Sequence, residues 1–268
     1  MEQTIKTLIY IHAFFGGLGL ITGMISIFVK KGGFNHKRTG KIFSYSMIIS
    51  SLISLFVARM PNHENLFLFL IGIFTIYLIL AGNRALTLKN KIKTKADLVD
   101  KLISGIMLLV SIGMLILGII GMVQKVENSI LYFFFGGFGT FMTIRDFQTF
   151  KVFTKKKNAW LISHLGRMIG ALIASVTAFL VAGLHIGTTL VWIMPTILGT
   201  VYIIYWNRQF KSKNKDKIVL EKYLNINGDE DLRILKHAFL NSYFQTGLKG
   251  NIDEAVIERG LKNGMDEI

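Results

Sequence analysis

The chain has 268 residues, of which 51% are hydrophobic, and its 31 Lys and Arg residues outnumber its 16 Asp and Glu residues to give a net charge of +15. A mean hydropathy of +0.49 is too high for an ordinary soluble domain of this length. The absence of cysteine excludes disulfides, thiolate metal sites and iron–sulfur clusters.

Long apolar stretches follow one another through the first 206 residues. Most approach the roughly 20 residues that a helix needs to cross the hydrocarbon core of a bilayer. Because lipid offers no partners to backbone amides, such stretches cross it as helices. The sequence therefore predicts an all-α membrane protein, a bundle of seven transmembrane helices at residues 7–29, 42–58, 66–88, 102–123, 129–144, 159–182 and 190–206.

The loops between these stretches alternate between basic and nearly uncharged. The first, third and fifth loops and the segment after residue 206 are rich in Lys, whereas residues 183–189 contain no Lys or Arg. Basic residues are retained on the cytoplasmic side of a membrane. We therefore expect the N-terminus outside, the C-terminus in the cytoplasm, and anionic lipid headgroups as partners of the basic loops. No groove-reading motif accompanies the charge, so nucleic acid is not an expected partner.

Two regions are expected, a seven-helix transmembrane domain over residues 1–206 and a basic linker with a small cytoplasmic helical tail over 207–268. Apolar residues recur at helical spacing over 218–224 and 232–243, and a capping box predicts a final helix over 252–261. A segment of about fifty residues with so few large apolar side chains rarely folds alone. We expect the tail to pack under the bundle, on the bilayer surface, or against a cytoplasmic partner or a second copy of the chain.

Polar side chains within the apolar stretches fall into two layers under this orientation. A charge in a spanning segment is costly, so it is usually paired or placed in a polar cavity. The outer layer contains His12, Arg59, His63 and His185. The inner layer contains Asn83, Arg84, Arg145, Asp146, His164 and Arg167, with His36 in the adjoining loop.

The inner layer is the predicted ligand-binding site. His164 and Arg167 are three residues apart and so share a helical face. Asp146 is expected to be the only carboxylate in the membrane that can balance the arginines. One interpretation is a site for an anion or lipid headgroup, with His164 as a proton-sensitive partner. The other is structural, with Asp146 paired to one arginine while the others reach lipid phosphate. The candidate residues are His164, Arg167, Arg84, Asp146, Arg145 and His36.

A haem interpretation depends on the depths of the histidines. His12 and His164 are expected to lie roughly 12–15 Å apart along the membrane normal, too far to ligate one haem. Two other pairs remain, His12 with His185 outside and His36 with His164 inside, which would place one haem b in each leaflet. No other cofactor and no separate metal site is predicted.

Several short segments resemble a bacterial family of predicted multi-pass membrane proteins that is described only as a domain of unknown function. They are Ile11-His12-Ala13, Lys31-Gly32-Gly33 with His36-Lys37, Gly82-Asn83-Arg84-Ala85-Leu86, residues 163–181 from Ser-His-Leu-Gly-Arg onward, and Trp192-Ile193-Met194-Pro195-Thr196. The resemblance covers residues 1–206. It implies a bacterial inner-membrane protein without implying an activity, and it places His12, His36, Arg84, His164 and Arg167 on polar positions of the family.

Enzymatic motifs are absent from the sequence. There is no His-Glu-x-x-His, no Gly-x-Ser-x-Gly, and no lysine in residues 190–206 for a retinal Schiff base. No catalytic residue is predicted. We expect non-enzymatic binding or transport of a small anion, lipid or proton at the inner polar layer. The alternatives are a two-haem electron-transfer protein of b type and a structural or signalling membrane scaffold.

Overall fold

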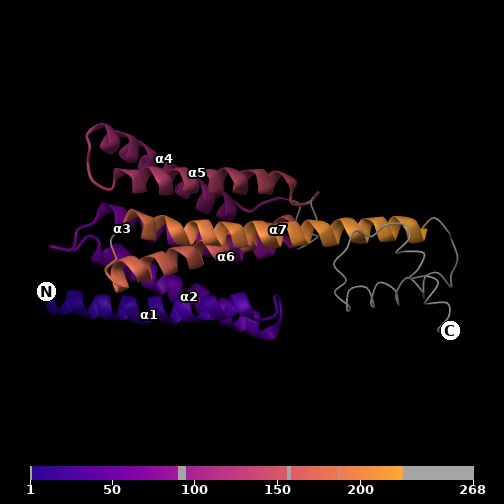
Figure 1. The fold of residues 1–268 in the computed structure, drawn as a ribbon, viewed down its shortest axis with the longest axis horizontal. Coiled ribbons are helices and arrows are strands. Elements are labelled where there is room, and N and C mark those ends of the chain that lie inside the picture. The colour runs from indigo at the N-terminus through magenta and orange to yellow at the C-terminus, as the bar shows by residue number, and fades with distance from the viewer. Residues whose placement is uncertain (1, 90–94, 156–157, 187, 226–268) are drawn as a thin grey trace. The chain divides into compact units, whose positions relative to one another are not determined.

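The computed structural model describes residues 2–89, 95–155, 158–186 and 188–225. Every regular element in these ranges is a helix, which confirms the all-α class. The elements in chain order (Figure 1) are α1 (Glu2–Phe28), α2 (Phe34–Val57), α3 (Leu66–Ala85), η1 (Leu86–Lys89), α4 (Leu98–Val123), α5 (Ser129–Val152), α6 (Ala159–Ala178), η2 (Phe179–Gly183) and α7 (Thr189–Asn225).

The chain is a multi-pass helical membrane protein by the length and apolar composition of its helices. Six described segments are long and apolar enough to cross a bilayer: Glu2–Phe28, Phe34–Val57, Leu66–Lys89, Leu98–Val123, Ala159–Val181 and Leu190–Phe210. Helix α5 has 24 residues, the same number as α2. It is not among the six because polar residues, including Arg145, Asp146 and Lys151, follow its apolar half.

Several helices extend beyond the apolar stretches from which they were predicted. Helix α2 begins at Phe34 rather than residue 42, α4 begins at Leu98 rather than 102, and α5 ends at Val152 rather than 144. Helical hydrogen bonding satisfies the backbone, and long cationic side chains reach water from a helix end. Ionisable residues expected in loops therefore lie on helices, and this changes which side chains meet.

The chain divides into two compact units, residues 1–203 and 204–268. Helix α7 passes from the first into the second, and the helix predicted at 218–224 is part of it. Residues 207–217, expected as a linker, are also helical. The helices predicted at 232–243 and 252–261 lie outside the described residues.

Within residues 1–203 the packing defines two four-helix rings that share two members. Helices α1, α2, α3 and α6 contact one another in a closed cycle, which we call the first ring. Helices α3, α4, α5 and α6 form a second such cycle, the second ring. The α4–α5 hairpin and the α1–α2 hairpin are both visible in Figure 1. The α3–α6 pair is thus the wall between two bundle interiors, where bundles usually place their ligand sites.

Close approach of α4 and α5 depends on glycine. A Cβ built on Gly136 would lie 2.7 Å from the backbone nitrogen of Leu115 and 2.9 Å from the carbonyl oxygen of Ser111. Because both neighbours are backbone atoms, the helices would have to separate to admit a methyl group. Small residues allow this kind of contact between membrane helices, which adds dispersion energy that lipid does not provide.

We predict that Gly136→Ala lowers the free energy of unfolding by about 1–3 kcal/mol through overpacking. Gly137→Ala is the matched control, because its Cβ would lie 3.8 Å from a Leu115 methyl group. That variant should be neutral, or gain up to about 1 kcal/mol from helix propensity. Thermal unfolding of both purified proteins in the same detergent measures the difference. Equal stability of the two variants would contradict a close backbone contact between α4 and α5 at Gly136.

Candidate functional site

Asp146 lies at the centre of a buried polar cluster in the second ring. Its Oδ2 accepts hydrogen bonds from the Tyr77 hydroxyl at 2.6 Å and from the Ser104 hydroxyl at 3.0 Å. Its Oδ1 accepts from Nη2 of Arg167 at 2.5 Å. Tyr77, Ser104, Asp146 and Arg167 come from α3, α4, α5 and α6, so each helix of the ring contributes one side chain. We call these four residues the Asp146 cluster.

Arg167 is enclosed as completely as its partner. Its Nη2 also donates to the Met142 carbonyl at 2.6 Å, and its Nε donates to the Tyr77 hydroxyl oxygen at 3.1 Å. The Arg167 and Asp146 side chains are only 7% and 3% exposed. Gly82 of α3 makes room for this arginine, because a Cβ there would lie 3.1 Å from Cβ of Arg167. The absence of a side chain at Gly82 thus brings α3 close enough for Tyr77 to reach the pair.

A second ion pair joins α3 to α4 through Arg84. Its Nε donates to Asp100 Oδ1 at 2.6 Å and its Nη2 donates to Asp97 Oδ2 at 2.5 Å. Asp100 is buried and also accepts the backbone N–H of Asp97 at 3.0 Å. The expectation that Asp146 is the only carboxylate available to the arginines is therefore wrong. Because α4 begins at Leu98, Asp100 lies inside the first helical turn, facing α3.

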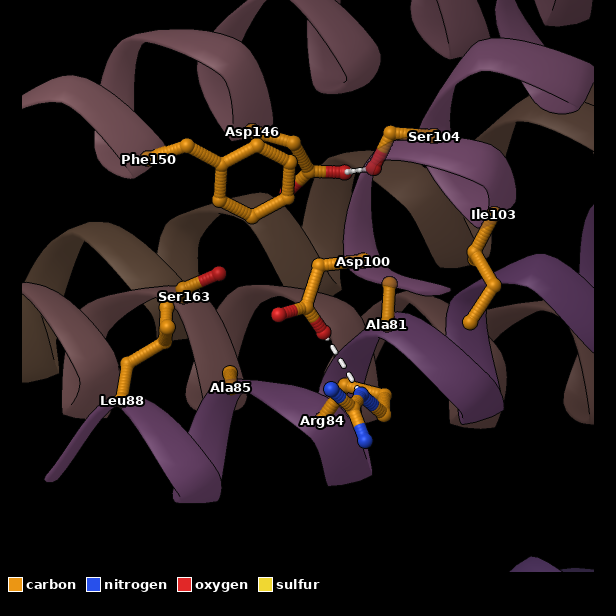
Figure 2. A pocket seen from close by; sticks show the side chains of 10 residues that line it. All are labelled: Ala81, Arg84, Ala85, Leu88, Asp100, Ile103, Ser104, Asp146, Phe150 and Ser163. Carbon is orange, nitrogen blue, oxygen red and sulfur yellow. Dashed lines mark hydrogen bonds and ion pairs between the residues drawn. The ribbon is translucent and has the colours of Figure 1, made fainter. Parts of the chain in front are cut away.

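A small pocket is lined by residues from both ion pairs (Figure 2). Arg84, Asp100, Ser104 and Asp146 all line it, and Ser163 of α6 contributes a hydroxyl. The remaining lining residues are Ala81, Ala85, Leu88, Ile103 and Phe150. Figure 2 shows the Ser104–Asp146 hydrogen bond and the Arg84–Asp100 pair on separate parts of the pocket wall. The space suits about one water molecule, which needs several polar partners of this kind.

Three histidines share one hydrogen-bonding arrangement in the first ring. Nδ1 of His36 lies 3.1 Å from the Ser26 carbonyl, that of His164 lies 2.8 Å from the Gly82 carbonyl, and that of His12 lies 2.9 Å from the Ser50 carbonyl. A carbonyl can only accept, so Nδ1 of His36 and Nδ1 of His164 each carry a proton. Nδ1 of His12 also lies 2.9 Å from the Ser50 hydroxyl, which can donate to it. When the His36 and His164 rings are neutral, their Nε2 atoms keep their lone pairs.

The predicted inner layer is thus divided between two places. Arg167, Asp146 and Arg84 belong to the second ring, while His36 and His164 hydrogen-bond within the first. His164 and Arg167 both face α3, as their spacing predicted. Arg145 is exposed on α5, and His185 is exposed after η2 with φ of 55°.

Sequence reasoning missed Tyr77, Ser104, Asp97 and Asp100 as members of the site. A signal existed for the two aspartates, because their spacing matches an N-cap residue and a third-position partner at a helix start. Nothing in the sequence separates Tyr77 or Ser104 from other polar residues in apolar stretches. Their role follows only from the distance between helices.

Comparison with known proteins gives one short similarity. A 44-residue segment, 16% of this chain, is 52% identical to the magnesium-transporting ATPase, P-type 1, of Escherichia coli (strain K12) and covers 5% of that protein. The same-named protein of Salmonella typhimurium (strain LT2) is 47% identical over 53 residues, 20% of this chain and 5% of its own. The chain spans about one twentieth of these relatives. No family model and no solved structure matches. These matches establish no family.

We predict that Arg167→Met destabilises the protein by about 3–5 kcal/mol, because it leaves the Asp146 carboxylate buried without its cation. The double variant Arg167→Met/Asp146→Asn should recover most of that loss. A neutral carboxamide needs no counter-charge and still accepts from Tyr77 or Ser104. Unfolding of both variants in detergent measures the coupling. A double variant less stable than Arg167→Met would show that charge neutralisation does not govern this cluster.

Proposed function

We propose that the chain crosses a bacterial inner membrane seven times, with its N-terminus outside and the loops rich in lysine in the cytoplasm. In this proposal α5 crosses the membrane in addition to the six segments that are apolar enough to do so by composition. It packs antiparallel along α4, since Gly118 lies against Phe133 near one end and Ser104 against Asp146 near the other. A helix that follows a spanning helix over this length covers the same depth. Asp146 is tolerated in it because Arg167 neutralises its charge.

The topology can be tested with single cysteines, because the natural chain contains none. Glu127 precedes α5 and Lys155 follows it, and both are exposed. In intact cells, an impermeant maleimide should label Glu127→Cys directly. It should label Lys155→Cys only after the membrane is permeabilised. Labelling of both residues from the same side would exclude α5 as a span.

We further propose that the protein takes up protons and relays them through the pocket of the second ring. The observation that supports this is the meeting of two buried carboxylates, Asp100 and Asp146, from different helices at one water-sized space. Acidic groups buried in membrane bundles commonly form proton relays. A water in the pocket would connect Asp100 to the hydroxyl of Ser104, which already donates to Asp146.

Binding of an anion or a lipid headgroup is less favoured by the same contacts. Arg84 and Arg167 already donate to aspartates, so an anion would have to displace an internal carboxylate from each guanidinium. The exposed Arg145 lies outside the pocket lining. The pocket is also far smaller than a phospholipid headgroup. A proton needs no such space and can pass along hydroxyl, carboxyl and water oxygens.

The Arg84 group provides the entry of the proposed relay. The Asp97 side chain is 51% exposed, whereas the Asp100 side chain is 2% exposed, and both bind the same guanidinium. Arg84 holds the two carboxylates near each other but cannot accept a proton itself, so a water bridging them would carry the proton from the half-exposed carboxylate to the buried one and then to the pocket. From Ser104 and Asp146 the chain continues to the Tyr77 hydroxyl.

We predict that proteoliposomes containing the protein acidify or alkalinise faster than empty liposomes when a potassium–valinomycin potential is imposed. A trapped pH dye reports the flux. Ser104→Ala and Asp100→Asn should each lower the rate severalfold, because each removes one member of the chain. Glu127→Gln, an exposed carboxylate in the α4–α5 loop, should retain it.

A wild-type rate equal to that of empty vesicles would refute the relay. The relay would also be refuted if Ser104→Ala and Asp100→Asn both left the rate of proton flux unchanged while size-exclusion chromatography showed both variants to be folded. If labelled phosphate crosses the same vesicles and both variants abolish its flux without altering proton flux, the anion function replaces the proton one.

A further inference from the structure

We infer that the inner end of the first ring is a binding site for one b-type haem, with His36 and His164 as its two axial ligands. This site lies on the opposite side of the α3–α6 wall from the pocket of the second ring. It does not depend on the proton relay.

The two histidines lie on helices that face each other across the ring. Helix α2 contacts α1 and α3, and α6 contacts the same two helices. In a four-helix bundle, side chains on facing helices project into the shared interior and build cofactor sites there. A haem needs this arrangement because its iron must lie between two imidazoles that approach from opposite faces of the porphyrin.

The two histidines also lie at the same depth. Helices α2 and α6 both run antiparallel to α3, as the pairs Ser44–Asn83 and Leu55–Gly72 show for α2 and the pairs Gly82–Met168 and Leu78–Gly170 show for α6. Phe43 and Leu172 each lie 2.8 Å from a Cβ built on Gly23, which places them at one level. His36 precedes Phe43 by seven residues and His164 precedes Leu172 by eight. At about 1.5 Å per residue, the two histidines lie about 10 and 12 Å below that level.

Both imidazoles are held in the orientation that a metal ligand requires. Nδ1–H of His36 is fixed on α1 by the Ser26 carbonyl, and Nδ1–H of His164 is fixed on α3 by the Gly82 carbonyl. A hydrogen bond of this kind sets the tautomer and raises the basicity of the other nitrogen. The two rings are also close enough to interact electrostatically. Each contributes Nε2 as the free donor atom.

The surrounding charge favours haem over a bare divalent ion. Lys31 Nζ donates to the same Ser26 carbonyl at 2.9 Å, and Lys37 and Arg38 are exposed on the first turns of α2. A porphyrin brings two propionates that such cations can bind, whereas a bare cation would be repelled. Among the described residues, no group of three or more His, Cys, Asp and Glu side chains could hold a metal ion. Two imidazoles alone complete the axial coordination of haem iron but not a typical zinc site.

A flat ligand can also approach α2 beside His36. Gly40 lies one turn further along the helix, on the same face, and a Cβ there would meet no atom within 4 Å. Glycine permits close approach of a ligand to the backbone. The outer pair, His12 with His185, lacks comparable support. His12 is held by a hydrogen bond to α2, but His185 is exposed in the loop after η2 and does not lie on a helix of the ring.

The test is expression of the full chain with added δ-aminolevulinate and iron, followed by purification in detergent. We expect a Soret band, α and β bands on reduction, and about one haem per chain by the pyridine haemochromogen assay. His36→Gln and His164→Gln each keep a donor for the carbonyl but remove the ligand, and each should lower the haem content at least about tenfold. His63→Gln, in an exposed loop, is the control and should keep it.

Gly40→Leu provides a second variant that retains both histidines but fills the space beside His36. It should lose haem as well. The inference is overturned if the wild-type protein has no Soret band, or if the band survives in both ligand variants. It is equally overturned if elemental analysis finds stoichiometric zinc, copper or iron that depends on both histidines without any Soret band, because the site would then hold a bare ion.

Discussion

The buried Asp146–Arg167 pair is the interaction on which the arrangement of the second ring depends. An ionised carboxylate in hydrocarbon is expensive unless its charge is neutralised and its oxygens accept hydrogen bonds. Asp146 meets both requirements, but only because Tyr77, Ser104 and Arg167 arrive from three other helices. Helix α5 carries Arg145, Asp146 and Lys151 in its second half, so the pair also permits it to remain in the bundle. Neutralising the charge of Asp146 and holding α5 against α3, α4 and α6 are therefore the same requirement.

The wall formed by α3 and α6 connects this constraint to the first ring. Gly82 lies in that wall, near the C-terminal end of α3. Its Cα faces Arg167 and Met168, and its carbonyl accepts the hydrogen bond of His164. A displacement of α6 against α3 would alter both interactions at once. The two proposed sites are thus chemically distinct but share a backbone segment, where a Cβ at Gly82 would press against the side chains of Met168 and Arg167.

The apolar stretches predicted helices correctly because periodicity and length suffice where a whole segment must satisfy its backbone in lipid. The same reasoning placed the helix ends too far inward at α2, α4 and α5, since hydropathy falls before helical hydrogen bonding stops. Asp100 illustrates the consequence. As a loop residue it has no assigned partner for its negative charge. Inside the first turn of α4 it binds Arg84 across the contact between α3 and α4. The face shared by His164 and Arg167 could be predicted, because it depends only on spacing along one helix.

The sequence by itself determined a helical membrane protein, the approximate positions of its long helices, and the identity of its rare intramembrane charges. These properties are local, since they follow from the free energy of placing each segment in lipid. Only the tertiary structure decided which charges are partners, that the inner polar residues divide between two rings, and that Tyr77, Ser104 and Asp100 belong with them. Pairing depends on which helices are neighbours, and that is decided by glycine contacts and side-chain packing between segments far apart in the chain.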